Sequence, residues 1–176
     1  MKQNKVILIG YMGSGKSAVG LLLKKKIGLS FWDLDDYIEK QENTSIASLF
    51  SSRGELYFRS LERKYLEQLL VYPNPMIIAL GGGTPCYYDT MDFLTQNENT
   101  TTVYLKTSIT ELGARLFPTR KSRPLIAHLQ SEEELTEFIG KHLFERIPFY
   151  SHANFTIATD GLTSTEVAQK IATLLT

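Results

Sequence analysis

The chain has few of the features that stabilise a secreted or membrane-bound protein. Its single cysteine, Cys86, excludes an internal disulfide, which agrees with a reducing compartment. No apolar run approaches the length of a membrane span, and no apolar targeting segment precedes the first predicted strand. The 19 basic and 19 acidic residues balance, so no overall field attracts nucleic acid or anionic lipid. We therefore expect a cytoplasmic protein that acts on small molecules, without nucleic-acid or membrane partners.

Strand-like and helix-like segments alternate along the chain. The predicted strands are Lys5–Ile9, Ser30–Leu34, Met76–Leu80, Thr101–Leu105 and Asn154–Ala158. The predicted helices are 16–27, 36–42, 45–70, 107–117, 132–146 and 163–175. This alternation predicts an α/β fold with a parallel sheet covered on both faces, and the length of 176 residues suits one domain over 1–176. Ligands in such sheets bind beyond the carboxyl ends of the strands.

A phosphate-binding loop follows the first predicted strand. The stretch Gly10-Tyr-Met-Gly-Ser-Gly-Lys16-Ser17 has the spacing of a P-loop and leads into a helical pattern. Its glycines let successive backbone N–H groups surround a phosphate, while Lys16 reaches the β- and γ-phosphates and the Ser17 hydroxyl can bind Mg²⁺. The nucleotide-binding residues that this pattern predicts are Gly13, Ser14, Gly15, Lys16, Ser17 and Ala18. The pattern therefore predicts binding of a nucleotide with its metal ion.

Two carboxylates follow at the end of the second predicted strand. Asp33 and Asp35 occupy alternate strand positions and should point the same way, while Leu34 turns into the core. One carboxylate could help to hold Mg²⁺ and the other could orient or deprotonate an acceptor hydroxyl. A capping cluster for a helix that begins near Tyr37 is the alternative, and we expect that role for Asp36.

Two further motifs are ambiguous when each is taken alone. Glu55, Arg59 and Glu62 share one face of a predicted helix, which a surface ladder of ion pairs would also explain. Gly81-Gly82-Gly83 follows the third predicted strand. Three successive glycines destabilise any helix or strand, so their presence favours a backbone that passes close to other atoms. A loose turn is the alternative.

Basic residues gather in a segment that loses helical periodicity after Pro118. Arg120, Lys121 and Arg123 lie within residues 117–129, which we interpret as a lid that closes over the nucleotide and stabilises the transferring phosphoryl group. A solvated basic loop is the competing interpretation.

The last predicted strand is preceded by the stretch Arg146-Ile-Pro-Phe-Tyr150. The Arg146 guanidinium could bind a carboxylate with both of its terminal nitrogens. The three histidines have no partner at ligand or catalytic spacing, and we expect them to be structural; they are His128, His142 and His152.

In their order, these motifs resemble those of the shikimate kinase family. The motifs are Gly10–Ser17, Asp33-x-Asp35, Gly54-Glu55-x-x-Phe58-Arg59-x-x-Glu62, Gly81-Gly82-Gly83, Arg123-Pro124-Leu125 and Arg146-x-Pro148-x-Tyr150. The resemblance covers nearly the whole chain. It implies the three-layer P-loop kinase fold of the nucleoside-monophosphate-kinase type, with a five-stranded parallel sheet of order 2-3-1-4-5. It also implies transfer of phosphate from ATP, with Mg²⁺, to the 3-hydroxyl of shikimate, on the route to chorismate.

The resemblance also implies a role for each motif. Residues about 34–62 form the acceptor-binding region, and about 117–129 form the lid. The acceptor pocket then comprises Asp35, Arg59, Gly81, Gly82, Gly83 and Arg146. The catalytic groups are Lys16, Asp35 and Arg123, the metal ligands are Ser17 and Asp33, and the nucleotide contacts include Arg123 and Arg115, the latter against the adenine. We expect a monomer whose ligands are ATP and shikimate.

Two alternatives remain at this point. A gluconate or nucleoside-monophosphate kinase would share the P-loop and the sheet but would have no reason to carry these acceptor-side motifs. A nucleotide-binding regulator without catalytic activity is the second alternative, and the presence of Lys16, Asp33, Asp35 and Arg123 argues against it.

Overall fold

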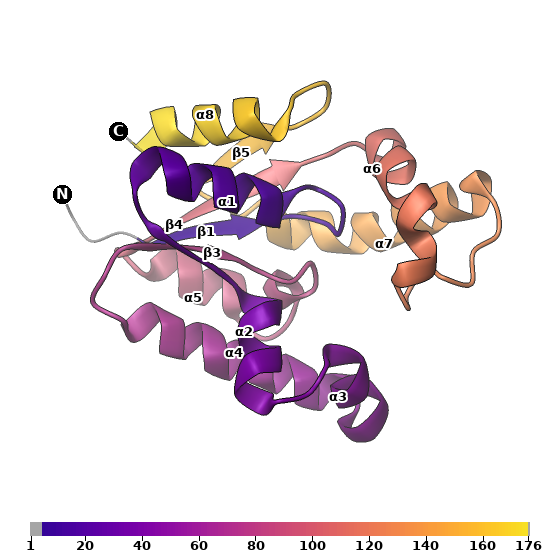
Figure 1. Ribbon diagram of the computed structural model, residues 1–176, viewed down its shortest axis with the longest axis horizontal. Helices are drawn as coiled ribbons and strands as arrows, with labels where there is room; N and C mark the ends of the chain where they lie inside the picture. Colours follow the sequence, from indigo (N-terminus) through magenta and orange to yellow (C-terminus); the bar gives the residue numbers. More distant parts are fainter. Residues whose placement is uncertain (1–4, 176) are drawn as a thin grey trace.

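The computed structural model describes residues 5–175 and contains a five-stranded parallel sheet (Figure 1). Its strands lie in the order β2-β3-β1-β4-β5, as expected. Their bounds are β1 Lys5–Ile9, β2 Ser30–Asp33, β3 Met76–Ala79, β4 Thr100–Lys106 and β5 Phe155–Ala158. Every pair of neighbouring strands is parallel, so all five carboxyl ends lie along the same edge.

Helices cover both faces of this sheet (Figure 1). The helices are α1 Lys16–Ile27, α2 Leu34–Glu42, α3 Ile46–Arg53, α4 Glu55–Val71, α5 Thr90–Gln96, α6 Ile109–Leu116, α7 Glu132–Tyr150 and α8 Ser164–Leu175. Two 3₁₀ segments complete the structure, η1 Thr84–Cys86 and η2 Phe117–Ser122. Helices α1 and α8 pack on one face, whereas α2, α4, α5 and α7 lie on the other.

The alternation of side chains along β1 builds two separate cores. Val6 and Leu8 belong to the cluster under α1 and α8, and Ile7 and Ile9 belong to the cluster on the opposite face. All four side chains are buried. A central parallel strand must be apolar on both faces, which explains why this segment reads as an uninterrupted apolar run.

The predicted helix over 45–70 is in fact two helices. The break falls at Gly54, which has a φ of 80° and a ψ of 170°, a conformation that non-glycine residues avoid. The Gly54 N–H still closes the last turn of α3 on the Phe50 carbonyl. The apolar periodicity runs on through the break, so it conceals the change of direction.

Helix α5 and the C-terminal end of helix α7 also differ from the prediction. The short helix α5 was not predicted, since seven residues are too few to show a helical period. Helix α7 continues past its expected end at residue 146 to Tyr150, with Pro148 inside it. The Tyr150 side chain is fully buried and its hydroxyl donates to the Gly82 carbonyl, which anchors this last turn.

The start of α2 corrects the prediction for the acidic cluster. The helix begins at Leu34, and its N-cap is Asp33, whose side chain accepts a hydrogen bond from the Asp35 N–H. Asp36 is therefore not the cap, and Asp35 lies in the first helical turn instead of on the strand. A strand one residue shorter than predicted accounts for the change. Leu34 is buried, as expected.

No helix within residues 5–175 is both long enough and apolar enough to cross a membrane.

Two helical glycines differ in the room that surrounds them. A methyl group added to Gly20 in α1 would meet the Phe31 ring at 2.2 Å. We expect Gly20→Ala to lower the free energy of unfolding by about 1–3 kcal/mol through overpacking, despite the better helix propensity of alanine. Gly140→Ala in α7 is the control, because its nearest contact would be Ile109 Cδ1 at 3.7 Å. Urea unfolding of both variants tests this, and equal effects would contradict it.

Candidate active site

The P-loop connects β1 to α1 and holds the Lys16 ammonium at its centre. Lys16 Nζ donates to the carbonyls of Gly10 at 2.8 Å and Tyr11 at 3.0 Å. Burial and the nearby Arg123 lower the pKa of Lys16 to about 8, against the opposing influence of nearby carboxylates. The loop thus presents a cation that a phosphate would further stabilise in its charged form.

A cavity of about 450 Å³ opens over this loop. Its walls include Gly13, Gly15, Lys16, Ser17, Ala18, Asp33, Arg115 and Arg123. Ser17 Oγ donates to Asp33 Oδ2 at 2.6 Å, so the hydroxyl and the carboxylate that follow two different strands meet in its wall. The predicted residue Ser14, within the loop, is buried, and its Oγ has no hydrogen-bond partner among the described residues.

Asp35 lies beside this cavity with a strongly shifted pKa. Burial, together with the nearby Glu62 and Asp33 carboxylates, raises it from 3.8 to about 7, although Lys16 and Arg59 act in the opposite direction. The side chain therefore changes its charge near neutral pH. A carboxyl with such a pKa suits a group that accepts a proton from a hydroxyl.

Arg59 is held by the acidic residues one turn away on either side. Its Nη1 donates to Glu62 Oε2 at 2.8 Å, and its Nη2 donates to Glu55 Oε1 at 3.1 Å. The Arg59 side chain is only 10% exposed, and that of Glu62 only 2% exposed. The ion pairs of the alternative interpretation therefore form, but the side chains of Arg59 and Glu62 are largely buried and do not belong to a surface ladder. The Tyr87 ring also lies 4.4 Å from the Arg59 guanidinium carbon.

The glycine run passes directly over these side chains. A Cβ at Gly83 would lie 2.6 Å from Arg59 Nη2, and one at Gly81 would lie 2.9 Å from Glu62 Oε1. A Cβ at Gly82 would lie 3.3 Å from the Met12 N of the P-loop. The three glycines thus allow the backbone to pass between the arginine and the phosphate-binding loop, as the close-approach interpretation predicts.

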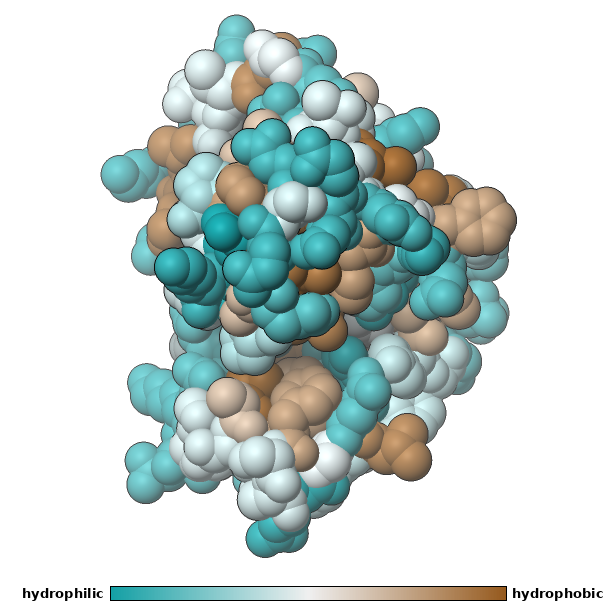
Figure 2. Space-filling view, turned by 90° about the vertical axis from the view of Figure 1, so that its right-hand side faces the viewer, coloured by the Kyte–Doolittle hydropathy of each residue, from teal (hydrophilic) through white to brown (hydrophobic). Residues whose placement is uncertain are grey.

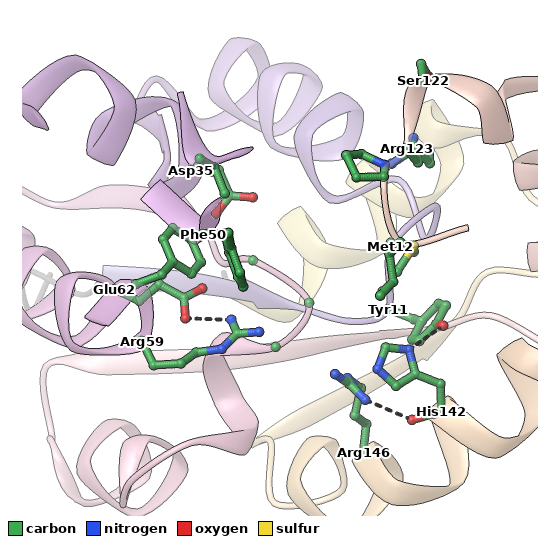
Figure 3. Close-up of a pocket in the computed structure, with 17 residues that line it drawn as sticks. Tyr11, Met12, Asp35, Phe50, Arg59, Glu62, Ser122, Arg123, His142 and Arg146 are labelled. Carbon is green, nitrogen blue, oxygen red and sulfur yellow. Dashed lines mark hydrogen bonds and ion pairs between the residues drawn. The ribbon is translucent and has the colours of Figure 1, made fainter. Parts of the chain in front are cut away.

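A second cavity, of about 380 Å³, lies next to the first (Figure 3). Asp35, Glu62 and Arg59 lie on one side of it, and Tyr11, His142 and Arg146 lie on the other. Seventeen residues line it, among them the predicted Asp35, Arg59, Gly81, Gly82, Gly83, Arg123 and Arg146. Its lining also includes residues for which the sequence predicts no part in the pocket, namely Tyr11, Met12, Ile46, Phe50, Ser122 and His142.

The structure gives one histidine a partner that spacing along the sequence does not show. His142 Nδ1 is 2.8 Å from the Tyr11 hydroxyl, and the imidazole lies in the wall of the second cavity. Its partner is 131 residues away in the sequence, so spacing could not reveal it. His128 and His152 are exposed and line neither cavity.

The two cavities share one wall. Both are lined by Met12, Asp35, Gly81, Gly82 and Arg123. Arg123 Nε is buried without a hydrogen-bond partner among the described residues, which leaves a cationic donor available between the two spaces. On this side of the molecule the surface is hollowed between an upper and a lower part, and hydrophobic side chains are visible within the hollow (Figure 2).

The basic residues near Arg123 do not all reach the cavities. Arg115 lines the first cavity, where its Nη1 donates to the Gly13 carbonyl at 3.3 Å. Arg120 instead donates to the carbonyls of Phe117 and Leu129, which ties the start of the 117–129 segment to its end. Lys121 is exposed and lines neither cavity.

A P-loop at the carboxyl edge of an all-parallel sheet of this order, beside a second cavity that shares its wall, defines a P-loop kinase of small molecules. The profile of the shikimate kinase family matches residues 12–176, and the chain belongs to this family.

Individual relatives agree with the family match. Shikimate kinase of Flavobacterium johnsoniae is 46% identical over 171 residues, which cover 97% of this chain and 98% of that one. The crystal structure of shikimate kinase from Bacteroides thetaiotaomicron superposes with a TM-score of 0.89 at 34% identity, over 98% of both chains. Shikimate kinase from Acinetobacter baumannii in complex with shikimate gives 0.83 at 31% identity, over 98% of this chain and 92% of that one.

The raised pKa of Asp35 has a consequence for stability. Because the folded-state pKa of about 7 exceeds the value of 3.8 for an unperturbed carboxyl, ionised Asp35 destabilises the fold. This penalty is absent below pH 3.8, grows as pH rises and is complete above pH 7. We expect Asp35→Asn to raise the melting temperature by about 5 °C at pH 8 and by less at pH 5.

Differential scanning calorimetry at the two pH values measures this effect. Glu98→Gln, at an exposed position, is the control and should shift the melting temperature little at either pH. Equal stabilisation by Asp35→Asn at both pH values would show that ionisation is not what strains the site.

Proposed function

We propose that this protein transfers the γ-phosphoryl group of ATP to the 3-hydroxyl of shikimate and so forms shikimate 3-phosphate. The observation that carries this proposal is the wall shared by the two cavities, in which Asp35, Gly82 and Arg123 face both spaces. Phosphoryl transfer needs donor and acceptor oxygens in line with little covalent help from the protein. Two adjoining cavities with a cation between them meet that need.

The first cavity is the proposed ATP site. Backbone N–H groups of Gly13, Ser14, Gly15, Lys16, Ser17 and Ala18 would surround the phosphates at the N-terminus of α1. Lys16 would exchange its loop carbonyls for phosphate oxygens. Arg115, at the rim of this cavity, is the proposed contact for the adenine.

The second cavity is the proposed acceptor site. Arg59 and Arg146 approach it from α4 and α7 and would bind the shikimate carboxylate, for which a planar guanidinium is the best-matched side chain. Gly81, Gly82 and Gly83 line this cavity and would place their backbone beside the ring. The apolar rings of Phe50 and Phe58 line the same cavity and would pack against the carbon skeleton.

Asp35 is the proposed partner of the attacking hydroxyl. With a pKa near 7 it would be available as a carboxylate to orient the 3-hydroxyl and to accept its proton as the new bond to phosphorus forms. Arg123 and Lys16 would stabilise the charge that develops on the transferring group. The segment 117–129, which carries Arg123, is the proposed lid that excludes water from this transfer.

The residues at the P-loop fit a magnesium ion held in part by a nucleotide. Ser17 Oγ and Asp33 Oδ2, 2.6 Å apart, are both hard oxygen donors. No group of three or more His, Cys, Asp or Glu side chains among residues 5–175 could hold a metal ion unaided. Ser17 and Asp33 would therefore hold Mg²⁺ together with phosphate oxygens and water, and the ion would neutralise phosphate charge.

A panel of acceptors tests the proposed function. With ATP and Mg²⁺, we expect ADP formation with shikimate to exceed that with quinate, gluconate or AMP by at least about 100-fold in kcat/KM. Quinate carries an additional hydroxyl and a saturated ring, gluconate is an open chain, and AMP has no carboxylate, so none of them places the same polar groups against the site. Chelation of Mg²⁺ should abolish turnover. Phosphorus NMR of the product locates the phosphate on the ring.

Turnover of gluconate in place of shikimate would establish the alternative kinase. Nucleotide binding without turnover of any acceptor would favour the regulator instead.

A substitution at Arg59 distinguishes the proposed roles of the two cavities. Arg59→Lys keeps the charge but loses the planar fork, so the KM for shikimate should rise by about 10-fold or more while the affinity for ATP changes less than about twofold. Arg63→Lys, one turn further along α4, is the matched control, because Arg63 pairs with Glu67 and Asp89 and lines neither cavity. Weakened ATP binding with an unchanged KM for shikimate would place Arg59 on the wrong side of the site.

A further inference from the structure

Tyr11 and His142 connect the P-loop to the acceptor cavity. The Tyr11 side chain is 2% exposed, and its ring meets the His142 ring edge-on at 5.5 Å. The Tyr11 hydroxyl and His142 Nδ1 are 2.8 Å apart. Neither side chain has been given a part in the proposed transfer, although both line the acceptor cavity.

The direction of this hydrogen bond determines which nitrogen of His142 carries the proton. Burial raises the pKa of Tyr11, so its hydroxyl keeps its proton. Among the described residues, that hydroxyl has no other hydrogen-bond partner than His142 Nδ1. A buried O–H group needs an acceptor, so the hydroxyl donates and Nδ1 is unprotonated. The neutral imidazole then carries its proton on Nε2.

His142 is neutral under ordinary conditions. Burial, with Arg146 and Arg59 adding to the effect, lowers its pKa to about 4, while Glu145 and Glu55 oppose the change. The imidazole therefore lies in the field of both arginines that face the acceptor cavity. An anion bound by Arg146 and Arg59 would therefore also lie near the His142 imidazole.

The remaining N–H of His142 has no partner within the described chain. His142 and Arg146 are one helical turn apart on α7, and Arg146 Nη1 donates to the His142 carbonyl at 3.2 Å. Figure 3 shows both side chains on the same side of the cavity, facing Arg59 across it. An N–H donor next to a guanidinium suits a carboxylate, which accepts several hydrogen bonds at once.

We propose that His142 Nε2–H is a further donor to the carboxylate of the acceptor, and that Tyr11 maintains it in the donor form. This inference rests on the proposed function and adds a residue that selects for a carboxylate-bearing acceptor. A neutral donor completes the hydrogen bonds of the carboxylate without adding a third positive charge to the cavity. It also connects the P-loop backbone with the site that binds the acceptor, because the Tyr11 carbonyl is bound to Lys16.

Nitrogen NMR of protein labelled at histidine tests the tautomer. In the free protein we expect His142 Nε2 to be protonated and Nδ1 to be unprotonated, and the Nε2 resonance should shift when shikimate is added. Tyr11→Phe should produce a mixture of tautomers. A protein with Nδ1 protonated, or an Nε2 resonance unchanged at saturating shikimate, would overturn the proposal.

Kinetics of matched variants test the role. His142→Phe keeps a flat ring but removes both nitrogens, so the KM for shikimate should rise about 10-fold while kcat and the KM for ATP stay within about twofold, the effect expected for loss of one hydrogen bond to a charged group. His142→Gln places an amide N–H near the position of Nε2 and should restore most of the affinity. His152→Gln, at an exposed position, should behave as the unaltered protein.

The outcomes separate this inference from the proposed function. If the unaltered protein does not turn over shikimate, the proposed function fails. If turnover is normal and His142→Phe leaves the KM for shikimate unchanged, the function stands and the role of His142 is wrong. If His142→Gln is no better than His142→Phe although both are folded, the N–H group is not what the acceptor contacts.

Discussion

The parallel pairing of β1 with β3 is the interaction on which the site depends. Leu8 pairs with Ala79, and the Leu80 N–H continues the ladder by donating to the Leu8 carbonyl. Strands β1 and β3 therefore end at the same level of the sheet, and the P-loop and the glycine run begin side by side. The pairing of Asp33 with Ala79 adds the end of β2 to the same edge. A shift of one residue in either pairing would separate the phosphate-binding loop from the acceptor wall.

The sequence predicted the arrangement of the sheet better than the limits of its helices. Strands β1 and β3 are short, fully buried runs between turn signals, and the ordered motifs implied the strand order. Helix limits depend on single residues. Gly54 divides a continuous apolar pattern, and Asp33 starts a helix where alternation suggested a strand. Such changes depend on backbone angles and capping bonds, which a hydrophobic period does not record.

Within the site, residues in dense motifs were predicted and isolated residues were not. The assigned roles stay predictions, but the structure does bring the P-loop, Asp35, Arg59, the glycines and Arg146 together. The pairing of Tyr11 with His142 spans 131 residues and joins side chains that carry no motif of their own. Only the fold brings them together. The structure also separated the basic residues of the 117–129 segment, because Arg120 fastens the segment while Arg123 faces the cavities.

The hydrogen bonds that Lys16 makes within the loop have a consequence for how a phosphate group would bind there. The carbonyls of Gly10 and Tyr11 already coordinate the ammonium group. Phosphate oxygens that approached Lys16 would have to replace these two carbonyl oxygens as hydrogen-bond acceptors. Because the carbonyls already offset part of the cost of burying the ammonium group, only the difference between the two sets of hydrogen bonds would contribute to the affinity for phosphate.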